Sequence, residues 1–170
     1  MSDYPAWSFR VPLRRDVEPA ALRALAAVAR DVPPDREDLD ALHPVVAHYL
    51  EDWTRMLHYE PRPYVGSPVR LSGIGTHEPS LTIEFSQHDD EHADVGYVLW
   101  LWVLTLAARP QREPWLIGHH VATRRYEREW KAITVDPAGI DLHGDPMSWA
   151  ELDAAWAELV ADPYWATWRR

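Results

Sequence analysis

One apolar segment constrains the fold of this 170-residue chain more than any other part of the sequence. Six of its apolar side chains follow the spacing of one helix face: Val95, Val98, Leu99, Trp102, Val103 and Leu106. Trp100, Leu101 and Leu104 are apolar as well, so a buried strand would produce much the same run. The fold therefore depends on which of the two structures residues 95–106 adopt.

The flanks of residues 95–106 favour the helix. Four acidic residues crowd the start of the segment, where they complement the partial positive charge of a helix N-terminus: Asp89, Asp90, Glu91 and Asp94. Arg109 follows the last apolar turn, and Pro110 is a helix stop. Gly96 opposes the assignment by about 1 kcal/mol. We predict a helix over residues 95–106.

The rest of the chain alternates between strand and helix patterns. Strands are predicted at residues 7–13, 69–75, 81–87, 115–123, 128–135 and 140–142, and helices at 19–32 and 44–58. Pro12 has no N–H to donate, so the first strand is expected to end there or to lie at an edge of the sheet. Ser148 and Glu151 form a capping box at the start of the last helix, which ends at Asp162-Pro163.

This order of elements predicts an α+β fold. Strand, helix, two strands, helix and strand is the split βαβ, ferredoxin-like arrangement, in which helices cover one face of an antiparallel sheet. We expect one domain over residues 1–170, with a helical and loop insertion at 33–68, an added C-terminal hairpin, and a C-terminal helix and tail at 147–170. If residues 95–106 form a strand instead, the sheet becomes a longer meander with helices at both ends.

The composition excludes several functional classes. With 27 acidic and 17 basic side chains the net charge is −10, which argues against binding nucleic acid or anionic lipid, since both need a basic face. The chain has no cysteine, which excludes disulfides, thiol catalysis and cysteine-ligated zinc. The longest apolar run is shorter than the roughly 20 residues of a membrane span. Met1–Pro5 does not resemble the start of a signal peptide, so a cytoplasmic protein is expected.

Residues 88–92, His-Asp-Asp-Glu-His, match the H-x-x-E-H pattern of one group of zinc hydrolases. On a helix, His88 and His92 would share one face, where they could hold zinc while Glu91 acts as a base. His119 or His120 could supply a third ligand. The favoured interpretation is a polar first turn before an apolar helix, since five-residue matches arise by chance. Zinc is the one cofactor that the sequence suggests.

Two further groups of polar residues are candidate binding residues. His119 and His120 lie in a predicted strand, so their rings point to opposite faces and one of them could line a cleft. Arg124 and Arg125 belong to the one dense basic segment of the sequence, residues 124–129, where planar guanidinium groups could hold a phosphate or a carboxylate. The alternatives are structural histidines and a solvated hairpin turn balanced by its own glutamates.

Ten tryptophans are the unusual feature of the composition. Trp100 and Trp102 cannot both point to the same side of a helix. Trp165 and Trp168 follow the end of the last predicted helix, where aromatic side chains often have no core of their own. Large rigid rings that stay exposed after folding tend to mark binding surfaces, whereas tryptophans that fill space between layers are structural. Both interpretations stand for Trp165 and Trp168.

Three functional classes are consistent with these features. The leading hypothesis is a non-catalytic interaction protein whose acidic surface and aromatic patch bind a basic protein partner, as an immunity protein, an inhibitor or a regulatory subunit would. The second is a small-molecule-binding protein with a tryptophan-lined cleft, and the third is an enzyme that uses His88, Glu91 and His92. Lys131 is the only lysine, a usage typical of high-GC bacteria. A homodimer through the apolar stripe of residues 95–106 is a further expectation, unless the helix at 44–58 covers that stripe.

Overall fold

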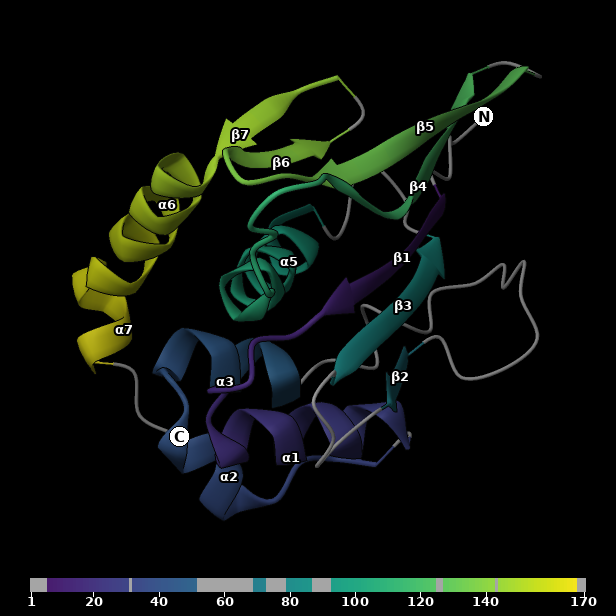
Figure 1. The fold of residues 1–170 in the computed structure, drawn as a ribbon. Helices are drawn as coiled ribbons and strands as arrows, with labels where there is room; N and C mark the ends of the chain where they lie inside the picture. The colour runs from purple at the N-terminus through teal and green to yellow at the C-terminus, as the bar shows by residue number, and fades with distance from the viewer. Residues whose placement is uncertain are drawn as a thin grey trace.

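The computed structural model describes residues 6–30, 32–51, 69–72, 79–86, 93–124, 127–142 and 144–167. Over these ranges the protein combines helices with one antiparallel sheet, as the sequence predicts. In Figure 1 the helices gather on one side of the sheet, which curves around α5. No helix within the described ranges is long and apolar enough to cross a membrane.

Seven strands form the sheet within the described residues, in the order β2-β3-β1-β4-β5-β6-β7. Their bounds are β1 Ala6–Pro12, β2 Val69–Ser72, β3 Ser80–Ser86, β4 Trp115–Arg124, β5 Glu127–Val135, β6 Gly139–Leu142 and β7 Pro146–Ser148. Every neighbouring pair is antiparallel. The first six strands match predicted ones, and β7 was not predicted because three residues are too few to show a pattern.

β1 lies inside the sheet, between β3 and β4, and Val11 is fully buried there. The strand ends at Pro12, as expected for a residue that cannot donate to a ladder, and the alternative of an edge strand is wrong. Past Pro12, the Leu13 N–H donates to the Pro79 carbonyl (2.8 Å), and the Arg14 N–H donates to the Leu106 carbonyl (2.9 Å). The chain is thus held on both sides where it leaves the sheet.

The described helices are α1 Pro19–Ala29, α2 Arg36–Ala41, α3 Pro44–Glu51, α5 Ala93–Leu106, α6 Trp149–Ala161 and α7 Pro163–Thr167. Prolines begin α1, α3 and α7, because the first helical turn does not need the N–H that proline lacks. The helix predicted for residues 44–58 is confirmed as far as Glu51, and the remainder lies outside the described residues. α7 corrects the sequence prediction of a tail, since Pro163 both ends α6 and begins another helix.

α5 confirms the helix predicted for residues 95–106 and forms the centre of the core. Seven of its side chains are buried: Val98, Leu99, Leu101, Trp102, Val103, Leu104 and Leu106. A helix that is apolar on every side must be covered on every side. α3 and α6 pack against α5, together with the sheet. The helix that begins at Pro44 therefore covers part of the apolar stripe, and the homodimer stays a prediction.

Close local contacts join β6, β7 and α6. A Cβ on Gly139 would lie 2.1 Å from the Met147 carbonyl oxygen, so only glycine fits where the two strands meet. Asp136 Oδ1 accepts a hydrogen bond from the Gly139 N–H (2.8 Å), which closes the turn before β6. The predicted capping box is present: Ser148 Oγ accepts from the Glu151 N–H (3.2 Å), and Glu151 Oε2 accepts from the Ser148 N–H (2.8 Å).

Candidate functional site

The structure places three candidate tryptophans in or against the core. Trp102 is 5% exposed, Trp165 is 8% exposed, and Trp100 is half-buried on α5. For Trp165 the structure shows the docking alternative, because its ring packs beside His48 of α3 with the ring centroids 5.5 Å apart. Trp102 and Trp165 thus fill space between layers of this chain, and a binding role for these tryptophans stays a prediction.

The candidate histidines and Arg124 lie on β4. His119 and His120 occupy consecutive strand positions, as predicted, and His119 is half-buried. Arg124 is the last residue of β4 and stands opposite Glu127 at the start of β5, as expected of the predicted hairpin. The binding roles of these residues stay predictions.

Five candidates lie outside the described residues: His88, Glu91, His92, Arg125 and Trp168. Within the part of the chain that the structure describes, no group of three or more His, Cys, Asp or Glu side chains could hold a metal ion. The alternative of a zinc site at residues 88–92 is therefore neither supported nor contradicted.

An uninterrupted acidic region covers the C-terminal elements. Residues 132–167 contain seven carboxylates and neither lysine nor arginine. Six of these seven residues are exposed, and together they define the acidic C-terminal surface: Asp136, Asp145, Glu151, Asp153, Glu158 and Asp162. They come from the turn before β6, the β6–β7 connection and α6. Composition revealed the net acidity of the chain, and the structure places much of it on one set of neighbouring elements.

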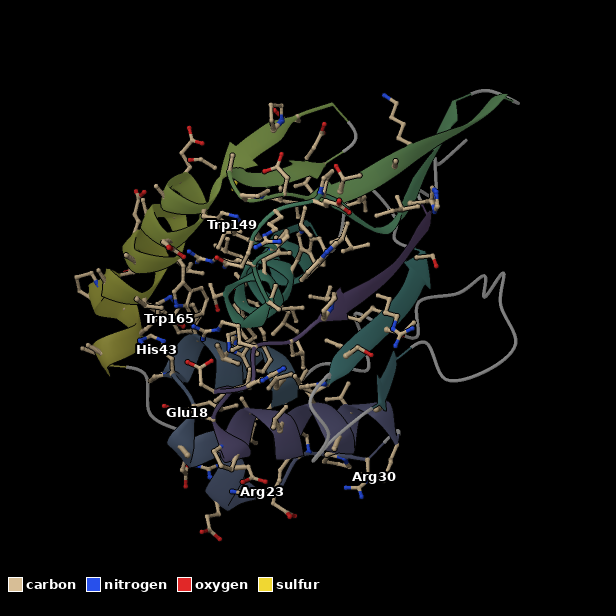
Figure 2. The ribbon with its side chains drawn as sticks, in the orientation of Figure 1. Glu18, Arg23, Arg30, His43, Trp149 and Trp165 are labelled. Atoms are coloured by element: carbon tan, nitrogen blue, oxygen red, sulfur yellow. The ribbon has the colours of Figure 1, made fainter. Side chains whose placement is uncertain are left out.

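Side-chain contacts hold α6 against the core. Trp149 is 6% exposed, and its Nε1–H donates to the Asp136 carbonyl (3.0 Å). The Arg109 guanidinium stacks over the Trp149 ring, 4.8 Å from its centroid, and Arg109 Nη2 lies 2.6 Å from Asp153 Oδ1. Figure 2 shows Trp149 on the side of α6 that faces α5. The carboxylates on α6 therefore belong to a helix that these contacts hold in place.

α7 extends this surface and is held by aromatic rings. Trp165 packs on both His48 and Tyr49 of α3, with its ring centroid 5.9 Å from that of Tyr49. Asp162 Oδ1 accepts from the Tyr164 N–H (2.9 Å) and so caps the helix. The neighbouring Tyr164 ring is 58% exposed. A large aromatic side chain thus stands in solvent beside the acidic residues.

His43 connects the helical insertion to α6. Its Nδ1 accepts from the Val45 N–H (3.3 Å), and its ring meets the Trp156 ring edge-on at 6.5 Å. Burial lowers the pKa of His43, and a hydrogen bond with the Val160 backbone opposes that effect. Burial therefore favours the neutral form of the ring, and protonation would disturb its contact with α6.

Three carboxylates of the acidic C-terminal surface share one side of α6. Glu151, Glu158 and Asp162 are spaced by seven and four residues, which places them in one row along the helix. Hydrogen bonds from the Ser148 side chain and backbone lower the pKa of Glu151, so this carboxylate is ionised at neutral pH. The row therefore forms a line of negative charge along α6.

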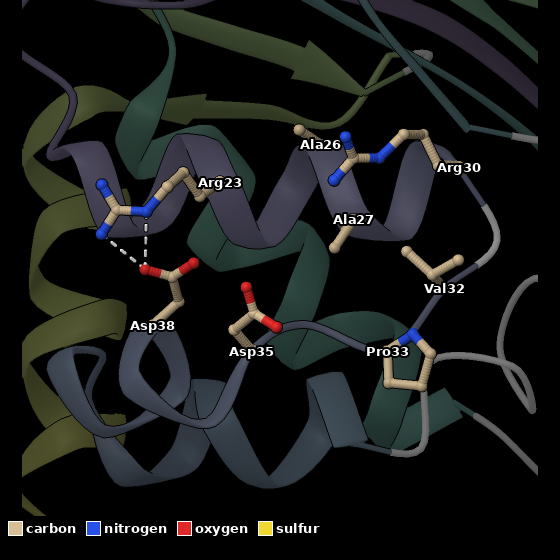
Figure 3. Close-up of a pocket in the computed structure, with 8 residues that line it drawn as sticks. All are labelled: Arg23, Ala26, Ala27, Arg30, Val32, Pro33, Asp35 and Asp38. Atoms are coloured by element: carbon tan, nitrogen blue, oxygen red, sulfur yellow. Dashed lines mark hydrogen bonds and ion pairs between the residues drawn. The ribbon is translucent and has the colours of Figure 1, made fainter.

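A cavity of about 290 Å³ lies between α1 and α2 (Figure 3). Asp38 is 4% exposed there, and Arg23 reaches it with Nη2 at 2.6 Å and Nε at 2.8 Å from Oδ1. The hydrogen bond to Asp38 raises the pKa of Arg23. A buried carboxylate needs such a partner, so closure of the α1–α2 corner explains both side chains. We assign this cavity a structural role.

A second cavity gathers arginines that sequence reasoning missed. It measures about 400 Å³, and Arg10, Arg14 and Arg15 line it together with Trp115. Arg10, Arg14 and Arg15 lie near one another in the sequence, but Trp115 is about a hundred residues away. The pattern Arg-Val-Pro-Leu-Arg-Arg at residues 10–15 was the available signal. This signal is weak, because the same residues form the end of a strand and because residues 124–129 contain as many arginines.

Comparison with protein-family models, with curated proteins and with solved structures finds no match to this chain. Evidence for a function therefore comes from its residues alone.

Proposed function

We propose that this chain is a non-catalytic protein-binding module whose acidic C-terminal surface binds a basic protein partner. The observation that carries the proposal is the absence of lysine and arginine from residues 132–167, whose carboxylates are nearly all exposed. Charge of one sign over neighbouring elements attracts a partner of opposite sign and speeds its association. An immunity protein, an inhibitor or a regulatory subunit of a bacterium would use such a surface in the cytoplasm.

The rigidity of α6 supports this proposal. A surface that is already ordered loses less entropy on binding than one that must be ordered by its partner. Trp149 anchors α6 through its indole N–H and its contact with Arg109, and Trp165 anchors α7 against α3. These anchors keep the carboxylate row in place before any partner arrives.

Glu158 gives a second reason to connect the acidic row with function. It lies in the last turn of α6, which contains no basic residue. A negative charge near a helix C-terminus opposes the helix macrodipole and costs about 0.5 kcal/mol. Local choices that lower stability tend to occur at functional positions. Binding of a cation at this end of α6 would offset the cost.

Tyr164 supports a protein partner rather than a small cation. Its ring is 58% exposed beside Asp162. Exposed tyrosine next to charged residues is typical of protein interfaces, where the ring supplies apolar contact and the hydroxyl a hydrogen bond. A lone metal ion or polyamine would leave this ring unused.

We also infer that residues 6–124 contain a ferredoxin-like, split βαβ core. The order β2-β3-β1-β4 with antiparallel neighbours supports this inference, as do α1 after β1 and α5 between β3 and β4. On this interpretation, β5, β6, β7, α6 and α7 are additions to the core. The acidic C-terminal surface is then built almost entirely on the added elements.

The experiment is affinity capture with charge variants. Wild-type protein is immobilised and exposed to an extract of the cells that carry its gene, and bound proteins are identified by mass spectrometry. Glu158→Lys reverses one charge in the row without opposing the helix macrodipole, so the variant is expected to stay folded. Glu113→Lys makes the same change in charge at an exposed position outside α6 and serves as the control.

A captured protein supports the proposal only if four conditions hold. It is basic, it binds the purified chain, salt weakens its binding steeply, and Glu158→Lys weakens its binding at least about tenfold while Glu113→Lys does not. A partner that binds both variants as well as wild type contradicts the proposed surface. A partner whose binding is insensitive to salt contradicts the electrostatic basis.

A further inference from the structure

The second cavity, which we name the arginine pocket, opens where β1 ends and α5 ends. Its volume of about 400 Å³ is that of a small-molecule site. Its lining residues are Arg10, Pro12, Leu13, Arg14, Arg15, Pro79, Ser80, Ala108 and Trp115. They come from four separate parts of the chain, so the pocket exists only in the folded protein.

Backbone hydrogen bonds fix the walls of the arginine pocket. The Leu13 N–H donates to the Pro79 carbonyl (2.8 Å), and the Ala108 N–H donates to the Pro12 carbonyl (2.8 Å). The segment that carries Arg14 and Arg15 is therefore clamped between the start of β3 and the end of α5. Such a frame fixes the backbone from which the arginines extend without the help of a ligand, which favours tight binding.

Three arginines line the pocket, and its described lining contains no carboxylate. Arg10 Nε donates to Ser80 Oγ (3.2 Å), and Ser80 is only 3% exposed, so this buried hydroxyl orients the Arg10 fork. None of the described lining residues is aspartate or glutamate. Asp16 is outside the lining, 78% exposed, and its Oδ1 lies 3.7 Å from Arg14 Nε. The chain has a net charge of −10, whereas the charged residues of the described lining are all arginines.

The rest of the described lining of the arginine pocket is largely apolar and includes a partly exposed aromatic ring. Trp115 is 38% exposed at the start of β4, although a tryptophan loses free energy by staying in water. Pro12, Pro79 and Ala108 complete this side. Guanidinium groups bind carboxylates and phosphates through paired hydrogen bonds, and an indole face stacks on planar rings. The arginines and the apolar residues of the lining thus suit the two parts of one kind of molecule: an anionic group and a planar ring.

We propose that the arginine pocket binds a small organic anion: a carboxylate or phosphate attached to a planar apolar ring. The anionic group lies among Arg10, Arg14 and Arg15, and the ring packs on Trp115. The described lining contains no histidine, cysteine, aspartate or glutamate that would act as a base, and the proposal is for binding and not for turnover. It is independent of the acidic C-terminal surface, which carries the opposite charge on other elements.

Isothermal titration calorimetry with three probes tests the proposal. Phenyl phosphate contains both parts of the ligand, inorganic phosphate contains only the anion, and phenol contains only the ring. Phenyl phosphate is expected to bind about fivefold more tightly than inorganic phosphate, and phenol is expected not to bind. The double variant Arg14→Gln/Arg15→Gln is expected to weaken phenyl phosphate binding at least about tenfold.

Three further variants separate binding in the pocket from general attraction between charges. Arg30→Gln removes an exposed arginine outside the pocket and is expected to leave affinity unchanged. Trp115→Ala is expected to abolish the preference for phenyl phosphate over inorganic phosphate. Asp16→Asn removes the carboxylate that competes for Arg14 and is expected to tighten binding about twofold. A gain of affinity in this last variant cannot arise from misfolding.

Several results would overturn the proposal. They are no saturable binding of phenyl phosphate by the wild-type protein, equal loss of affinity in Arg30→Gln and in the double variant, and binding of phenol as tight as that of phenyl phosphate. If wild-type protein binds no probe but self-associates, and the double variant is monomeric, the arginines bind the acidic C-terminal surface of a second copy. That outcome also rejects the small-molecule ligand.

Discussion

The acidic C-terminal surface and the arginine pocket differ in how they are built as well as in charge. The acidic residues follow one another between Asp136 and Asp162, and side-chain contacts hold their elements in place. The arginine pocket joins residues that are far apart in the sequence, and backbone hydrogen bonds frame it. One region is local in sequence and depends on a few large side chains. The other is non-local and depends on the sheet.

This difference has a practical meaning for substitutions. Removal of one anchoring side chain should disturb the acidic C-terminal surface, whereas no single lining side chain should disturb the frame of the arginine pocket. The two regions meet at the end of α5, where Ala108 lines the pocket and the next residue, Arg109, contacts α6. Stability and binding measured on the same variants can therefore show whether the two regions respond separately.

Trp149→Ala should have the largest effect. It removes a side chain that is 6% exposed, its hydrogen bond to Asp136 and its contact with Arg109. We expect a loss of about 4 kcal/mol in the free energy of unfolding, measured with urea. Trp115→Ala is the matched control, because that ring lies in the arginine pocket and is 38% exposed, and it should cost less than about 1 kcal/mol. Equal losses in the two variants would remove the distinction between the regions.

Gly139→Ala should have the next largest effect. The new Cβ would lie 2.1 Å from the Met147 carbonyl oxygen, so β6 and β7 must separate. We expect a loss of about 2 kcal/mol in the free energy of unfolding and weaker capture of the basic partner. Phenyl phosphate affinity should not change, since neither strand lines the arginine pocket. A fall in that affinity would show that the pocket depends on the C-terminal strands.

Ser148→Ala should cost about 1 kcal/mol, because it removes the side-chain cap of α6. Ser148→Thr keeps the hydroxyl and should stay close to wild type. The folded pKa of Glu151 is lowered by Ser148, so its contribution to stability is present above the ordinary value of 4.5 and is lost as the pH falls. The difference between Ser148→Ala and wild type should therefore shrink in acid. A difference that grows in acid would contradict this role for Glu151.

His43 should produce the smallest effect, seen as a dependence on pH. Burial lowers its folded pKa below the ordinary value of 6.5, so the unfolded chain takes up the proton more readily. Its stabilising contribution is then present above 6.5 and decreases as the pH falls through that value. Urea unfolding between about pH 8 and 5 should show a smaller loss of stability in His43→Leu than in wild type. Equal pH dependence in both proteins would contradict this assignment.

Elements with a strong local pattern could be predicted from the sequence. The capping box of Ser148 and Glu151 needs only residues three apart, and the α5 stripe was flanked by acids and by Pro110. β7 and α7 could not be predicted, because each is short and depends on neighbours. β7 pairs with β6 because Gly139 has no side chain to keep Met147 away. α7 is stabilised because Trp165 packs on His48 of α3.

The candidate sites were harder to predict than the elements. Net charge indicated an acidic protein, but the row of Glu151, Glu158 and Asp162 appears only once α6 is known to lie at the surface. The arginine pocket could not be predicted, since no pattern in the sequence indicates that Arg10 and Trp115 line the same cavity. Tryptophans were read as candidate contacts, yet Trp102 and Trp165 have large apolar areas that are buried in the core.

The burial of α5 on every side has a consequence for the order in which the protein is made. α5 leaves the ribosome before β4, β5 and α6, the elements that later cover much of it. Until the residues up to Ala161 have been synthesised, the nascent chain carries an apolar helix that is covered only in part, a form prone to aggregation. Completion of the fold must therefore wait for its C-terminal helix, and a chain cut before Trp149 should accumulate in inclusion bodies.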